Sequence, residues 1–278
     1  MAKSKFIIFI FLICFFAVPS SSLETTSKTL TIKPGKTLAI WIESSEPLKK
    51  LEGDIRGKKY PFYKVGDKYR GILGLDPLTT PGGYTLTLQA TDLEERQTEK
   101  TQKIEVLGRK VILEKVVLPQ DKKNLLVQEN LEYDQKKFKS VLTREVESQY
   151  WTNKFLIPVI GRITSSFGVF RGNLGFHRGI DLSGPAGKLI KAANAGKVVL
   201  AERLKVHGNT IVINHGQGVF TLYCHMLQFK VEVGDILKKG HFLGTVGNTG
   251  VSTAAHLHWG LSVHDVRVDP TEWTKKEF

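Results

Sequence analysis

Short runs that alternate apolar and polar residues, separated by glycine and proline, constrain the fold of this chain most. Tyr84–Ala90 alternates strictly, and Pro34-Gly35 marks a turn before the run Thr37–Ile42. Alternation places successive side chains on opposite faces of a strand, whereas an amphipathic helix needs apolar residues three or four apart. A spacing of roughly ten residues between such runs is typical of β-sandwiches. We therefore predict an immunoglobulin-like β-sandwich over residues 23–108, with strands at 29–32, 37–42, 84–90 and 101–106.

The last part of the chain, residues 151–278, is rich in glycine and almost without helical periodicity. Strands are predicted there at 162–167, 179–183, 196–204, 209–214, 219–226, 242–246 and 256–263. The chain as a whole is therefore expected to be mainly β, in two domains.

A linker over residues 109–150 joins these two β-rich segments. Residues 110–118 are compatible with one more strand, which Pro119 would end. From Glu129 to about Ser148 the composition shifts to Glu, Lys, Gln and Leu, and we predict one amphipathic helix. Its apolar residues recur near helical spacing at Leu131, Phe138, Leu142 and Val146.

The N-terminus has the pattern of a Sec-type signal peptide. Lys3 and Lys5 precede an apolar run over residues 6–18, and Pro19 with three serines follows. The run is shorter than the about 20 apolar residues of a membrane-spanning helix. We predict a signal peptide over residues 1–22, an exported protein of the periplasm or cell envelope, and no stable membrane insertion after cleavage. An uncleaved N-terminal anchor is the alternative.

Cleavage would remove Cys14 and leave Cys224, so the mature protein is expected to have no intramolecular disulfide. The formal net charge of +13 is dispersed along the chain and forms no basic tract. Such a charge suits an anionic surface or polymer, such as a cell wall, and we do not expect nucleic acid as a partner.

Histidines place the chemistry in the C-terminal domain, because all eight lie there, at 177, 207, 215, 225, 241, 256, 258 and 264. His256 and His258 are two apart in a predicted strand and would share one face. His177 and Asp181, four apart in an extended segment, would also share a face. Catalytic zinc usually has three protein ligands and one open position. His177, Asp181 and either His256 or His258 would supply them; the spacing leaves that choice, and other metals, open.

Tyr223-Cys224-His225 ends another predicted strand, with Tyr223 and His225 on one face. A further imidazole beside a metal could act as a general base, stabilise an oxyanion or protonate a leaving amine. We reject Cys224 as a nucleophile paired with His225, because adjacent strand residues face opposite ways.

Several motifs, taken together and in order, resemble the lysostaphin/LytM-type zinc metallopeptidases, the murein endopeptidase family. They include SSFG at 165–168, HRGIDLSGPAG at 177–187, TLYCHM at 221–226 and HLHWGL at 256–261. The resemblance extends from Phe155 to Trp273. It implies an antiparallel β-sheet peptidase domain with a groove over residues 151–278.

The resemblance also implies a role for each residue of the site. His177, Asp181 and His258 match the family's ligands of one zinc ion (Zn²⁺). His256 matches the catalytic base, and His225 matches the second catalytic histidine. The implied function is hydrolysis of amide bonds in peptidoglycan cross-links; the bond cut and the oligomeric state stay open.

Two other functions are kept as alternatives. Some relatives lack ligands and only activate amidases, so a non-catalytic peptidoglycan-binding activator of another hydrolase is one. A β-sandwich adhesin with an anchoring C-terminal domain is the other. Arg171 is shifted by one place from an arginine common in the family, Cys224 stands where a small residue is usual, and Ala254-Ala255 replaces a common Gly-Pro.

Overall fold

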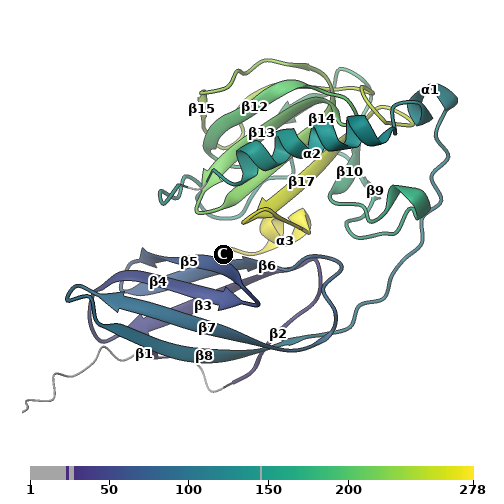
Figure 1. Cartoon of the computed structure of the whole chain (residues 1–278). Coiled ribbons are helices and arrows are strands. Elements are labelled where there is room, and N and C mark those ends of the chain that lie inside the picture. The colour runs from purple at the N-terminus through teal and green to yellow at the C-terminus, as the bar shows by residue number, and fades with distance from the viewer. Residues whose placement is uncertain (1–22, 25–27, 145) are drawn as a thin grey trace, which may run out of the picture.

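The computed structural model describes residues 23–24, 28–144 and 146–278. The predicted signal peptide, residues 1–22, lies outside these residues and stays a prediction. Within the described part, no helix is both long and apolar enough to cross a membrane. Figure 1 shows two β-rich units, one above the other, with a long helix lying across the upper unit. The prediction of a mainly β chain with two sheets is confirmed.

Eight strands form the N-terminal unit. They are β1 (Leu23–Glu24), β2 (Leu30–Ile32), β3 (Thr37–Ser44), β4 (Leu48–Ile55), β5 (Lys58–Val65), β6 (Lys68–Gly74), β7 (Gly82–Asp92) and β8 (Gln97–Val106). Their hydrogen-bonded order is β1-β3-β6-β5-β4-β7-β8-β2, and only the β2–β8 pair is parallel. Because β5 pairs with both β4 and β6, the two layers seen in Figure 1 enclose one core that includes Ile42, Leu86 and Leu88. The immunoglobulin-like assignment and the domain boundaries stay predictions.

The C-terminal unit is built on one antiparallel sheet, in the order β15-β12-β13-β14-β17-β10-β9, with β11, β16 and β18 at its margins. Its elements are β9 (Ile163–Ser165), the 3₁₀ helix η1 (Gly172–Leu174), β10 (Ile180–Ser183), β11 (Leu189–Lys191), β12 (Gly196–Leu204), β13 (Gly208–Gly216), β14 (Val219–Phe229), β15 (Ile236–Leu237), β16 (Phe242–Val246), β17 (His256–Val263), β18 (Val266–Val268) and α3 (Pro270–Lys275). Tyr223 and Trp259, directly opposite each other on β14 and β17, belong to the main core of the unit. Cys224 belongs to a second core cluster, which α2 covers.

The linker contains α1 (Gln120–Lys123) and α2 (Gln128–Leu142). Residues 110–118 do not form the extra strand; their single ladder contact is the bridge from Leu113 to Phe170. The helix ends at Leu142, earlier than predicted, because the following backbone turns to the sheet. There the Gln217 amide donates to the carbonyl oxygen of Val146 over 2.7 Å.

Asp134 fastens α2 to the sheet. Its buried carboxylate accepts hydrogen bonds from the amides of Lys205, Val206 and His207 and from His207 Nδ1, at 2.7 to 2.9 Å. Burial favours a raised pKa for Asp134, but these bonds, led by those from His207, lower it. The helix therefore has a defined position over β12–β14 despite its largely charged surface.

The two units are joined by direct contacts as well as by the linker. Trp273 Nε1 donates to Thr37 Oγ1 over 3.1 Å, and Lys36 Nζ donates to Asp269 Oδ2 over 2.8 Å. Trp273 is almost fully buried in the core of the C-terminal unit, against Trp151 and Phe155, and its indole nitrogen reaches the N-terminal unit. The start of β3 thereby contacts the last helix of the chain.

Candidate active site

The pairing of β10 with β17 positions two of the predicted ligands. Asp181 lies directly opposite His258 in this ladder, so both side chains point to the same face of the sheet. His177 precedes β10. The backbone amide of His177 donates a hydrogen bond to the Val169 carbonyl over 2.9 Å and fixes its position. A Cβ atom on Gly179 would lie 2.7 Å from the His258 ring. Only glycine at this position lets the three side chains converge.

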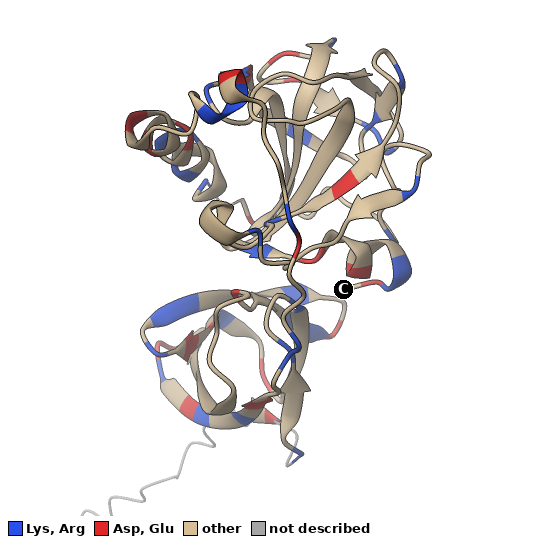
Figure 2. Cartoon of the chain, turned by 90° about the vertical axis from the view of Figure 1, so that its right-hand side faces the viewer, with Lys and Arg blue, Asp and Glu red and all other residues tan. Residues whose placement is uncertain are grey.

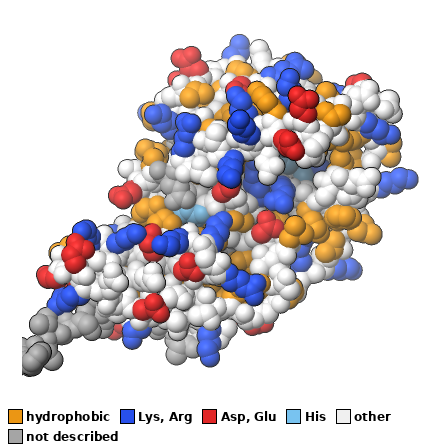
Figure 3. All heavy atoms as spheres, in the orientation of Figure 1, with side chains coloured by type: hydrophobic (Ala, Val, Ile, Leu, Met, Phe, Trp, Pro, Cys, Tyr) orange, Lys and Arg blue, Asp and Glu red, His pale blue; other side chains and the backbone are white. Residues whose placement is uncertain are grey.

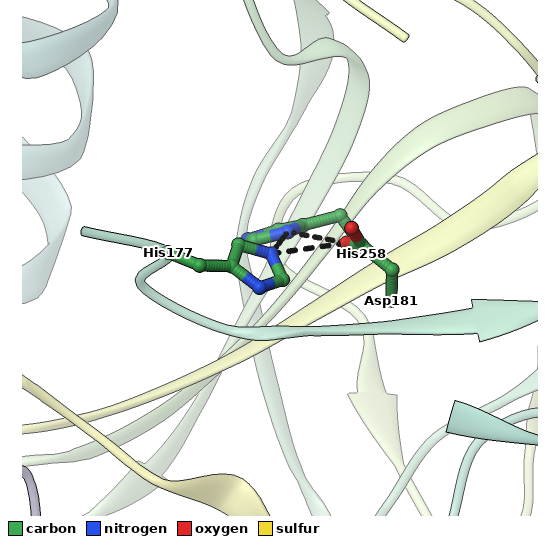
Figure 4. A group of neighbouring side chains, drawn as sticks. All are labelled: His177, Asp181 and His258. Atoms are coloured by element: carbon green, nitrogen blue, oxygen red, sulfur yellow. Dashed lines mark hydrogen bonds and ion pairs between the residues drawn. The ribbon is translucent and has the colours of Figure 1, made fainter. Parts of the chain in front are cut away.

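Three candidate ligand atoms form a compact triangle (Figure 4). His177 Nε2 lies 3.0 Å from His258 Nδ1 and 3.1 Å from Asp181 Oδ1, and His258 Nδ1 lies 3.0 Å from Asp181 Oδ1. Zinc binds such atoms at about 2.0–2.2 Å, and three ligand atoms this close together could hold one ion. His177 Nδ1 donates to the Ser166 carbonyl over 3.0 Å, which leaves the lone pair of Nε2 for a metal. The residues present fit zinc.

His256 and His225 lie beside this triangle and are oriented by backbone carbonyls. His256 Nδ1 donates to Ala254 O, and His225 Nδ1 donates to Thr249 O, both over 2.8 Å. Their ring centroids are 5.1 Å apart, and His256 Nε2 lies 3.5 Å from Asp181 Oδ1. In each ring Nε2 is therefore the nitrogen left to accept a proton.

The prediction that Tyr223 and His225 share a face is wrong. The Tyr223 hydroxyl is buried and accepts from the Ala193 amide over 2.8 Å, whereas His225 faces His256 in the groove. His225 has a φ of 60°, in the left-handed region, which interrupts the alternation of β14. Regular alternation along β14 would place the His225 imidazole on the same face as Tyr223, in the core.

The Asp181 carboxylate dominates the electrostatics of the site. Burial acts to raise its pKa, but the adjacent imidazoles of His177, His256 and His258 hold it well below the usual value. Burial also acts to lower the pKa of His256, yet the bond to Asp181 and its charge raise it overall. Burial lowers the pKa of His258 to about 3, against the opposing effect of Asp181. His225 has a pKa well below normal, through burial and the neighbouring charges of His256 and His258.

Cys224 does not contribute a nucleophile. It lies opposite His258 in the β14–β17 ladder but is buried beneath α2. Burial raises the pKa of its thiol to about 12, so the reactive thiolate is not formed near neutral pH.

Arg171 connects the triangle of candidate metal ligands to the linker. Its Nη2 donates to Asp181 Oδ2 over 2.7 Å and to Ser165 Oγ over 2.5 Å. It also forms an ion pair with Glu114 over 3.2 Å, and Glu114 accepts from Ser165 Oγ. Sequence reasoning missed Glu114, because nothing in the linker pattern distinguishes it from solvated acidic residues.

The groove above the triangle has a volume of about 310 Å³. His256 and His258 line it, and so do three linker side chains, those of Glu114, Val116 and Leu118. Figure 2 shows the linker running in front of the C-terminal sheet. We call residues 109–123 the strap.

The strap is held at both walls of the groove. On one wall, the Phe170 amide donates to Ile112 O over 2.8 Å and the Glu114 amide donates to Phe170 O over 2.9 Å. On the other, Lys122 Nζ donates to Gly250 O over 2.9 Å. The groove is therefore bridged from wall to wall.

Comparisons with known proteins match the part of the chain that contains these residues. A family model described as peptidase family M23 matches residues 175–270. The DD-carboxypeptidase/endopeptidase Mpg of Neisseria meningitidis serogroup B is 36% identical over 94 residues, which cover 34% of this chain and 22% of that protein. The peptidoglycan DD-endopeptidase ShyC of Vibrio cholerae serotype O1 is 33% identical over 114 residues, covering 39% and 26%. The chain thus matches less than a third of either relative.

A crystal structure from Pseudomonas aeruginosa, assigned to peptidase M23, extends the similarity to the N-terminal unit. It superposes with a TM-score of 0.67 at 24% identity and covers 91% of this chain and 97% of its own. This similarity concerns the fold, and it includes both β-rich units.

Proposed function

The C-terminal unit of this chain belongs to peptidase family M23, and we propose that the protein is an exported zinc endopeptidase that hydrolyses amide bonds in peptidoglycan cross-links. The observation that carries the proposal is the triangle of His177, Asp181 and His258, with two more imidazoles beside it. Relatives named as peptidoglycan DD-endopeptidases support the substrate. A location in the cell envelope follows from that substrate.

In this proposal His177, Asp181 and His258 hold one zinc ion. Bound zinc supplies Lewis acidity and lowers the pKa of a water molecule toward about 7. His256 takes the proton of the attacking water at Nε2, and its bond to Ala254 keeps that atom directed into the groove. His225, held by Thr249, is the second catalytic histidine and acts on the developing charge or the leaving amine. Arg171 holds Asp181 in its ligating position.

The complete set of five side chains favours an active enzyme over a non-catalytic activator of another hydrolase. The test uses the full chain with purified cell walls: metal content is measured, and released muropeptides are identified by mass spectrometry. We expect zinc in the protein, cleavage of cross-links, loss of cleavage with a chelator and recovery with added zinc. Protein that holds no zinc, cleaves nothing and yet stimulates an amidase would overturn the proposal.

The matched variants are His177→Ala and His241→Ala. His177→Ala should lose both zinc and cleavage, because it removes a ligand from the triangle. His241 is exposed on a turn away from the groove, so its variant should keep both. Equal zinc content in the two variants would contradict the ligand assignment.

A further inference from the structure

A second cavity, of about 460 Å³, lies between α2 and the C-terminal sheet. Phe138 and Lys139 line it from the helix, and Arg178 and Arg267 line it from the sheet side. His258 lines both this cavity and the groove, so the two spaces adjoin at one imidazole. In Figure 3, blue side chains gather at the hollow below α2.

Arg267 is the distinctive residue of this cavity. Its guanidinium lies over the Phe138 ring, 5.0 Å from the centroid. Burial lowers its pKa to about 10, and the charge of Arg178 acts in the same direction. Within the described residues, no hydrogen bond or ion pair reaches this guanidinium, whereas Arg70, Arg96 and Arg171 each have several. Arg267 is partly exposed along the cavity, and a bound anion would supply the charged hydrogen-bond partner that its guanidinium lacks.

Two more cations face the same space. Arg178 uses one nitrogen, Nη1, to contact Asp76 at 3.4 Å, and its side chain is half exposed. Lys139 is exposed on the helix surface. Among the described residues that line the cavity, Asp265 is the one carboxylate; it forms no ion pair with either arginine, although its charge acts to raise the pKa of Arg267. The excess of positive charge selects for an anion.

The remaining lining is mixed: Leu131, Phe138 and Leu142 supply apolar walls, and Gln135 and His207 add polar groups. A guanidinium beside apolar walls fits a carboxylate carried on a small aliphatic residue, because the fork of an arginine matches the two carboxylate oxygens. A peptide offers such a group at its C-terminus.

We propose that this cavity is a substrate subsite that binds a peptide carboxylate through Arg267 and Arg178. The inference deepens the proposed function, since it assigns the subsite to the peptide of the same substrate. Its position next to His258 would fix one end of that peptide while the adjoining groove holds the bond to be cut. The pair acts in binding and not on the reacting atoms.

Binding is measured by calorimetry on the full chain with N-acetyl-D-alanine and, as the neutral match, N-acetyl-D-alaninamide. We expect the carboxylate to bind and the amide to bind at least about 10-fold more weakly, the usual scale for a lost charged hydrogen bond. Arg267→Gln and Arg178→Gln should each weaken carboxylate binding by about 10- to 100-fold. Lys100→Gln, which removes an exposed charge from β8, should not change it.

Inorganic phosphate is the second arm of the binding test. Phosphate that binds more tightly than N-acetyl-D-alanine and depends on the same arginines would overturn the carboxylate assignment. Equal affinity of wild type and both arginine variants for N-acetyl-D-alanine would overturn the subsite itself. If Arg267→Gln lowers the Tm, its weaker binding could reflect partial unfolding, and the test then rests on Arg178→Gln alone. The Arg178 side chain is half exposed, so replacing it removes less packing.

Cleavage of soluble muropeptides separates this inference from the proposed function. We expect Arg178→Gln to raise KM about 10-fold with kcat unchanged, as for an interaction made equally in the ground and transition states. Cleavage with an unchanged KM would contradict the subsite but leave the peptidase proposal intact. Arginine-dependent carboxylate binding without any cleavage would contradict the peptidase proposal and leave the binding site standing.

Discussion

Glu114 in the linker lies 3.2 Å from the guanidinium of Arg171, in the wall of the groove. Because Arg171 also donates to Asp181, this ion pair links the strap to the metal-ligand triangle through a single side chain. Both partners are partly buried, so solvent screens the pair less than it would on an open surface.

Glu114→Gln should loosen the strap. The loss of a partly buried ion pair, of the order of 1 kcal/mol, would allow the strap to leave the groove more often and raise kcat/KM up to about 5-fold. Hydrogen exchange of residues 109–118 should become faster. Lys115→Gln is the control, since Lys115 is exposed on the same segment. Unchanged exchange in the Glu114 variant would show that this pair does not hold the strap.

Substitution of His256 or His258 by alanine should distinguish the residue that acts in catalysis from the residue that binds the metal. His258→Ala removes a corner of the triangle and should lose zinc, whereas His256→Ala should retain zinc and lose about 10²–10⁴-fold in activity, the scale of a positioned general base. Mass spectrometry measures the zinc content of each variant, and a cleavage assay measures its activity. The assignment within the pair is reversed if His256→Ala releases the ion and His258→Ala keeps it.

Asp134→Asn should destabilise the docking of α2. The neutral amide accepts more weakly than the carboxylate and places an NH₂ group against backbone amides, so we expect a loss of about 2 kcal/mol. Urea unfolding measures the change. Asp121→Asn is a matched control in the exposed helix α1. A loss in Asp134→Asn no larger than in this control would mean that the carboxylate does not anchor the helix.

His215 should make stability depend on pH. Burial lowers its pKa to about 4 from the usual 6.5, and the ring bonds Ala195 O and Thr221 Oγ1 inside the core. Between pH 6.5 and 4 the unfolded chain binds the proton and the folded chain does not, so stability falls as pH falls, by about 3 kcal/mol in total. Above pH 6.5 this contribution is fully present.

Urea unfolding at pH 7 and pH 4.5, with a chelator present so that metal release plays no part, tests this dependence. The His215→Gln variant should have a lower free energy of unfolding than the wild type at pH 7. Its free energy of unfolding should fall less than that of the wild type between pH 7 and pH 4.5. His241→Gln, at an exposed position, should follow the wild type. Parallel pH curves for all three proteins would contradict the assignment.

The alternation of apolar and polar residues in the sequence predicted much of the fold. The bounds of β12, β16 and β17 follow directly from alternation and flanking glycines, since both are properties of neighbouring residues. The strands β4 to β6 were not predicted individually, because β4 and β5 are rich in charged residues and β6 is buried along almost its whole length, so its sequence does not alternate clearly. The end of α2 was placed too late because the residues after Leu142 bond to the sheet, where Val146 O accepts from the amide of Gln217, which is distant in the sequence.

The candidate site was predictable where residues are close in the sequence or share a motif. His177 and Asp181 lie on one segment, and β17 brings His258 opposite Asp181; the spacing left the choice between His256 and His258 open, and the family resemblance pointed to His258. The left-handed backbone of His225 could not be predicted, because no glycine or turn residue marks it. Glu114 and Arg267 could not be predicted either, since each acquires its environment only when distant segments meet.

Because the strap bridges the groove, the topology of a substrate decides whether it can enter the groove. A chain with a free end can thread beneath a bridge that is held at both sides, but a cross-link within a continuous network has no free end. For the proposed substrate, the strap must therefore lift away from the groove at every turnover, which requires its contacts with Phe170 and Arg171, with Gly250, or with both to break. A soluble fragment could slide in with the bridge closed, so intact walls and short muropeptides would meet different barriers in the same groove.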